Sequence, residues 1–203
     1  MDSLARISTS RKTGAEPLVA NGLPVGPTLA DFWGWSVSDL VDNTARGVLA
    51  EFIIATALGT PTDGVRESWA SWDLTTPDGI RVEVKSAAYL QTWGQKAVSL
   101  ITFKTPKTLA WDADGGGYAE VAQRQAQVYV FALLAHTDKA TLNPLDLDQW
   151  TFYVLPTSAL NARTRSQHSI TLRTLAGLTA AVTFGDLAAA VHTAAEPFGA
   201  DAN

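Results

Sequence analysis

Residues 72–85 carry the most informative pattern in the chain and read WDLTTPDGIRVEVK. The Pro-Asp-Gly at 77–79 predicts a tight turn, because proline presets φ early in such a turn and glycine tolerates a positive φ at its end. After the turn, apolar and charged residues alternate: Ile80, Arg81, Val82, Glu83, Val84 and Lys85. A strand has a period of two, so the charged side chains share one face.

This hairpin is expected to bring Asp73, on its first strand, close to Glu83 and Lys85 on its second. An acid and an ammonium two residues apart on one strand face must lie side by side. Taken alone, Glu-x-Lys on a strand is also typical of an exposed surface ion pair.

Glu51 strengthens the case for a site. Residues 44–58 predict a helix, with Asp42 or Asn43 as its N-cap and Gly59 as its stop. The neighbours of Glu51 at helical spacing are mostly apolar, and a carboxylate on such a stripe is costly unless it is paired or binds a ligand. The plainer alternative is a Glu at the edge of the stripe that reaches solvent or pairs with Arg46.

The remaining chain predicts a mixed α/β fold with a central sheet of about five strands flanked by helices. We interpret residues 1–30 as a flexible tail or arm and residues 31–203 as one domain. Further segments with the pattern of strands or helices are a helix at 31–41, strands at 98–103, 127–135 and 150–155, and a helix at 184–195.

Composition limits the function classes. The chain has 203 residues, a formal net charge of −5 and no cysteine. Disulfides and thiolate metal sites are therefore excluded, and an acidic charge argues against a protein that coats nucleic acid without specificity. No stretch approaches the roughly 20 apolar residues that span a bilayer, so we expect no membrane association and a cytoplasmic location.

Two carboxylates on adjacent strands make a site of hard oxygen ligands, which suits Mg²⁺ or Mn²⁺. Such an ion activates a bound water and stabilises charge on a phosphoryl group, and a lysine beside it can orient that water. The residues therefore favour hydrolysis of a phosphodiester.

At these positions the sequence resembles the PD-(D/E)xK nuclease superfamily, which has the restriction-endonuclease-like fold. The family pattern is a helix with Glu, a strand Asp and then Glu-x-Lys, matched here by Glu51, Asp73, Glu83 and Lys85. Trp72 stands where the name-giving proline would be. The resemblance covers about residues 40–155 and implies that Asp73, Glu83 and the Val84 carbonyl bind the metal. It also implies that Lys85 positions the water and that Glu51 assists through the metal or its waters.

Weaker candidates lie outside this motif. Some relatives carry a Gln shortly after the Lys, which makes Gln91 a candidate, although we expect it to lie away from the site. Tyr89 and Trp93 are candidates for stacking on bases and equally for packing. The candidates for phosphate contacts include Lys104, Lys107 and Arg124, and the best placed are Lys104 and Lys107, just after the predicted third strand.

The leading hypothesis is a Mg²⁺-dependent DNA endonuclease, with RNA as a substrate not excluded, acting as a homodimer or with a partner subunit that supplies specificity. The alternative is an inactive nucleic-acid-binding or assembly module that kept the fold. A third reading has no site at all and predicts an exposed Glu51.

Overall fold

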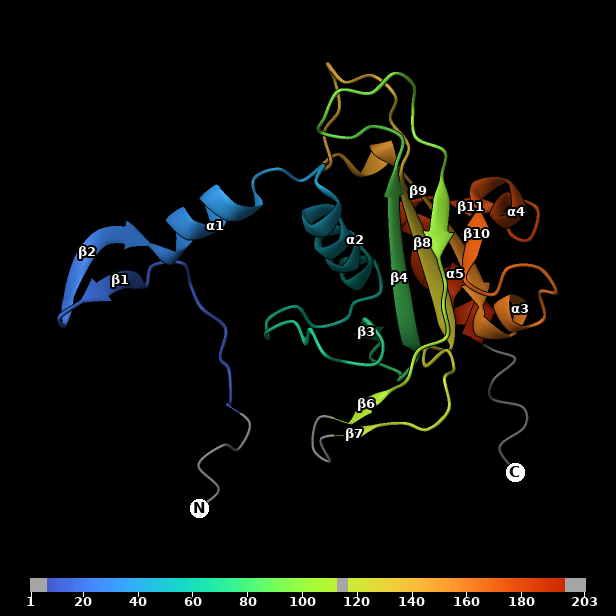
Figure 1. Cartoon of the computed structure of the whole chain (residues 1–203), viewed down its shortest axis with the longest axis horizontal. Coiled ribbons are helices and arrows are strands. Elements are labelled where there is room, and N and C mark those ends of the chain that lie inside the picture. The colour runs from blue at the N-terminus through green and yellow to red at the C-terminus, as the bar shows by residue number, and fades with distance from the viewer. Residues whose placement is uncertain (1–6, 113–116, 196–203) are drawn as a thin grey trace.

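The protein is organised around one mixed sheet. The computed structural model describes residues 7–112 and 117–195 (Figure 1). The strand order is β11-β9-β8-β4-β3, in which β4 and β8 run parallel and the other neighbouring pairs run antiparallel. The strands are β3 (Leu74–Thr75), β4 (Arg81–Ala88), β8 (Val128–Leu134), β9 (Trp150–Pro156) and β11 (Ala181–Val182). The predicted mixed α/β class and five-stranded central sheet are confirmed.

The hairpin predicted from residues 72–85 forms the edge of this sheet. Gly79 has a φ of +92°, and the Ile80 amide donates to the Thr76 hydroxyl across the turn at 2.9 Å. β3 pairs with only the start of β4, from Thr75 opposite Arg81 to Leu74 opposite Val82. In the described sheet, the second half of β4 therefore has no neighbouring strand on this side.

Each face of the sheet has its own core. On one face, α2 (Asn43–Ala57) and α5 (Leu187–Ala195) pack against β4, β8 and β9. On the other face, α3 (Thr157–Asn161) and α4 (Leu172–Ala176) join a second cluster around Phe131. Every residue of β8 is buried, which confirms the prediction of a central strand there.

The strand expected at 98–103 is displaced from the central sheet. β5 (Thr102–Lys104) pairs instead with β10 (Ser169–Thr171) in a separate two-stranded sheet. Phe103 and Ile170 are both buried in the second cluster, so this small sheet covers a face rather than extending an edge. The fifth central strand is β11. Another short pair joins β6 (Trp111–Asp112) to β7 (Gly117–Tyr118).

The start of the chain holds a hairpin that the sequence did not predict and the helix that it predicted at 31–41. β1 (Pro17–Ala20) and β2 (Leu23–Thr28) form a hairpin, followed by α1 (Leu29–Val37). We call residues 7–37 the arm. Figure 1 shows its hairpin and α1 projecting away from the sheet. α1 has no buried residue, and its aromatic side chains belong to neither core cluster.

No helix in residues 7–112 or 117–195 combines the length and apolar character needed to cross a membrane.

Candidate functional site

Asp73 lies at the free edge of β4. Its amide donates to the Val82 carbonyl at 3.1 Å, and its Oδ2 accepts from the Val84 amide at 2.7 Å. The carboxylate thus takes the place that a neighbouring strand would occupy. Because the N–H and C=O of one strand residue point to the same side, the Val84 carbonyl faces this edge as well.

Glu83 and Lys85 share one face of β4. Lys85 Nζ lies 2.5 Å from Glu83 Oε1, and both side chains are mostly buried. On the adjacent strand β8, their register partners are Tyr129 and Phe131. This face packs on the second core cluster, which explains how an ion pair on an edge-proximal strand becomes largely shielded from water.

The electrostatics connect the three acids. Burial raises the pKa of Glu83 above its ordinary value, and the charges of Asp73 and Glu51 raise this pKa further, while Lys85 lowers it. Burial and the charge of Glu83 likewise raise the pKa of Tyr129, which keeps its phenol protonated beside the pair. The charges of Asp73 and Glu51 therefore lie close enough to Glu83 to affect its pKa.

Glu51 is held by a residue that the sequence did not single out. Arg66 Nε lies 2.5 Å from Glu51 Oε2, and Arg66 Nη2 lies 2.7 Å from Glu51 Oε1. The Glu51 side chain is 13 % exposed and that of Arg66 42 %. The reading without a site, which predicted an exposed Glu51, is not supported. Hydrogen bonding to Glu51 raises the pKa of Arg66, so the guanidinium of this bidentate pair stays charged.

The alternative pairing of Glu51 with Arg46 is wrong. Arg46 is 3 % exposed and points the other way, toward β4. It donates to the Val41 carbonyl, the Asn43 side chain and the Ser86 hydroxyl at 2.7, 2.6 and 3.2 Å. Residues five apart on a helix are turned by about 140° from each other, so these two side chains cannot share a face.

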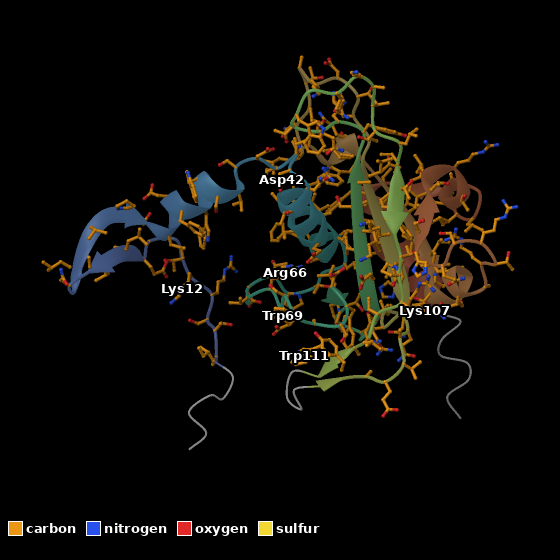
Figure 2. The ribbon with its side chains drawn as sticks, in the orientation of Figure 1. Lys12, Asp42, Arg66, Trp69, Lys107 and Trp111 are labelled. Atoms are coloured by element: carbon orange, nitrogen blue, oxygen red, sulfur yellow. The ribbon has the colours of Figure 1, made fainter. Side chains whose placement is uncertain are left out.

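A cavity of about 760 Å³ opens beside Glu51 and Asp73. The arm forms one side, and α2 with the loop between α2 and β3 forms the other. Figure 2 labels Lys12 on the arm side and Arg66 on that loop. Two of the candidate acids are therefore reachable from solvent on the α2 side of the sheet.

The donor set fits a small hard cation. Asp73 offers a carboxylate oxygen beyond the one bonded to Val84, Glu83 offers carboxylate oxygens, and the Val84 carbonyl faces the same edge. Mg²⁺ commonly uses one or two carboxylates and completes its shell with water and substrate phosphate. In the part of the chain that the structure describes, no three His, Asp or Glu side chains converge as a ready-made metal cluster.

The weaker candidates lie farther along. Gln91 donates to the Ala88 carbonyl and the Ser99 hydroxyl beyond the end of β4, and it lines a small separate pocket with Arg46. Tyr89 packs against the second core cluster, whereas Trp93 is exposed. Lys104 and Lys107 are exposed on and after β5. Contacts of Trp93 and the two lysines with DNA stay predictions.

Arg124 does not fit its expected role as a phosphate contact. It is 7 % exposed, and its guanidinium donates to Asn161, to Gln167 and to the Thr105 carbonyl. These bonds join the ends of β5 and α3 to the loop before β10. The structure gives Arg124 a place in the scaffold, where both of its terminal nitrogens are already hydrogen-bonded.

Fold and site together define an α/β protein whose central sheet presents acids and a lysine at an open edge, an arrangement suited to phosphate-ester chemistry. Residues 34–174 match the family model of bacteriophage T4 endonuclease IV. This match covers more than half of the chain, so the chain belongs to that family of nucleases. All four motif residues lie in the matched range, and nearly all of the arm lies before it. No curated protein matches the chain.

Proposed function

We propose that the protein is a metal-dependent DNA endonuclease of the PD-(D/E)xK type. One observation carries the proposal. Asp73 is fixed by the Val84 amide at the open edge of β4, and Glu83 and Lys85 flank that same residue in the strand. The acid, acid and lysine of the motif thus lie around one backbone position, which supports a shared site.

Each residue then has a chemical task. Asp73, Glu83 and the Val84 carbonyl would hold Mg²⁺ or Mn²⁺, which lowers the pKa of a bound water and polarises the scissile phosphate. Lys85 would orient the attacking water and stabilise the charge that builds on the phosphate oxygens. Glu51 would act on the opposite side of the strand through a water, once Arg66 no longer occupies both of its oxygens.

The test is cleavage of supercoiled plasmid and single-stranded DNA with Mg²⁺, with Mn²⁺ and with EDTA. We expect cutting that requires a metal and that falls by about a hundredfold or more in Lys85→Met and Asp73→Asn. Asn retains an oxygen that accepts from the Val84 amide, so its circular dichroism should match the wild type. Arg173→Ala, on α4, is the control. Wild-type cutting by Lys85→Met would overturn the proposal.

A second candidate function is a binding module without turnover. It is favoured by the pairing of Glu51 with Arg66 and of Glu83 with Lys85, which already neutralises two acids. Such a module should bind DNA yet show no turnover with either metal. A titration with Mn²⁺ separates the two readings, because an intact endonuclease site binds the ion and loses it in Asp73→Asn.

A further inference from the structure

The cavity beside Glu51 has two walls of different origin. The described residues after the arm, which we call the body, contribute α2 and the loop that follows it, including Phe52, Arg66 and Asp73. The arm contributes Ser10, Arg11, Lys12, Thr13 and Trp33. The body wall lies inside the range matched by the endonuclease family, whereas the arm wall precedes it. The arm therefore completes a cavity that the matched range alone leaves open.

Local contacts hold the arm wall in shape. Gly14 has a φ of +94°, and a Cβ placed there would lie 3.0 Å from the Trp33 ring. The Ala30 amide donates to the Gly14 carbonyl at 2.9 Å, and the Leu29 amide donates to the Glu16 carbonyl at 2.8 Å. These contacts fix Trp33 against the segment that carries Arg11 and Lys12.

A hydrogen bond joins the two walls directly. Arg11 donates to the Thr62 carbonyl at 3.1 Å, which ties the arm to the loop that carries Arg66. Arg66 in turn holds Glu51. A chain of contacts thus runs from the arm to a candidate acid of the site.

The lining suits a nucleotide. Trp33 is 40 % exposed and Phe52 55 %, so both offer accessible aromatic surface. Arg11, Lys12 and Arg66 supply positive charge, while Glu51, Glu67 and Asp73 supply negative charge. Glu51 is already paired with Arg66. The volume lies within the range of about 300–1,000 Å³ that is usual for ligand pockets.

We propose that this cavity binds the DNA nucleotide next to the scissile phosphate, with Trp33 stacking on its base and with Arg11 and Lys12 contacting its backbone. Aromatic faces accept any base, and the basic side chains follow the phosphates. This inference rests on the proposed function, because it places the cavity beside a cleavage site. It makes the arm a substrate-binding element of the nuclease.

Binding without catalysis tests it. Fluorescence anisotropy with a labelled oligodeoxynucleotide, in EDTA and at several salt concentrations, would be measured on the full chain. We expect Trp33→Ala to weaken binding about tenfold. The double variant Arg11→Ala/Lys12→Ala should weaken binding and reduce the steepness of its salt dependence.

Matched controls separate a local effect from a general one. Trp35→Ala removes a tryptophan from the same helix that does not line the cavity, and Arg165→Ala/Arg173→Ala removes two exposed charges elsewhere. Both should bind within about twofold of the wild type. Binding by Trp33→Ala at the wild-type level, or equal losses in Trp33→Ala and Trp35→Ala, would overturn the inference. So would a wild-type chain that does not bind the oligonucleotide.

Cleavage assays keep this inference distinct from the proposed function. In an active enzyme, Trp33→Ala should raise KM and leave kcat nearly unchanged, because Trp33 belongs to binding. A chain that never cuts but loses binding in Trp33→Ala would retain the cavity assignment and contradict the endonuclease chemistry. A chain that cuts with an unchanged KM in Trp33→Ala would retain the endonuclease chemistry and contradict the cavity assignment.

Discussion

At the scale of single residues, each acid of the site is balanced by a different partner. Asp73 accepts from a backbone amide, Glu83 pairs with Lys85, and Glu51 pairs with Arg66. Asp73, Glu83 and Lys85 were predictable because strand periodicity and the Pro-Asp-Gly turn fix their relative places. Arg66 was not, because it lies in an irregular loop whose path no periodic pattern reveals.

Arg66 should compete with a metal for Glu51. We expect Arg66→Ala to bind Mn²⁺ more tightly, because both Glu51 oxygens become available. Its unfolding free energy should change by no more than about 1 kcal/mol, since the pair is partly exposed. Mn²⁺ titration by calorimetry gives the affinity. The gain should vanish in Glu51→Gln/Arg66→Ala, and an unchanged affinity in Arg66→Ala would show that no competition exists.

Glu83 should make the stability of the metal-free protein depend on pH. Its folded pKa is raised above 4.5 by burial, so the folded chain keeps this proton to higher pH than the unfolded chain. The resulting stabilisation is complete below the unfolded pKa and is lost as the pH rises through the folded pKa. Urea unfolding in EDTA, from pH 4.5 upward, should show wild type losing stability relative to Glu83→Gln. Unfolding free energies of the wild type and Glu83→Gln that change with pH in parallel would refute this prediction.

At the scale of elements, the sequence predicted the positions of helices and strands better than the pairing between strands. The patterns of α2, β4, β8 and β9 were clear because each buries one or both faces in the core. β5 was placed in the wrong sheet because its partner, β10, lies far along the chain. The β1–β2 hairpin was missed because all but one of its residues are exposed, which leaves no alternation to read.

Arg124 should be a structural residue rather than a DNA contact. Arg124→Ala leaves the Thr105 and Gln167 carbonyls without this donor, and we expect a loss of about 2–3 kcal/mol in unfolding free energy. Denaturant unfolding measures that loss. DNA affinity below the melting range should stay at the wild-type value. Lys107→Ala, at an exposed site, should change stability by less than about 0.5 kcal/mol. A stable Arg124→Ala with weakened DNA binding would restore the original prediction.

At the scale of the whole molecule, the hydrophobic core and the cavity draw on different parts of the chain. Neither core cluster contains a residue of the arm, whereas the arm forms one wall of the cavity. The sequence could not predict this division, because the apolar side chains of α1 have the composition of a core helix. Only the three-dimensional structure shows that Trp35, at 85 % exposure, contacts little of its own chain.

Removal of residues 1–37 should therefore leave the rest of the protein folded. We expect the unfolding free energy to change by less than about 1 kcal/mol, because the main loss in the described contacts is at the Arg11–Thr62 bond. Urea unfolding followed by far-ultraviolet circular dichroism checks this. The truncated chain should bind DNA more weakly than the full chain. Loss of cooperative unfolding would show that the arm belongs to the folding unit.

The parallel pairing of β4 with β8 also sets the order of events during synthesis. Both clusters include residues of β8, which emerges from the ribosome long after α2 and β4. Until then, the apolar faces of α2 and β4 have nothing to pack on, and pairing between distant strands is slow. The nascent chain should therefore depend on chaperones over this interval, and it should become resistant to proteases only after β8 and β9 have been made.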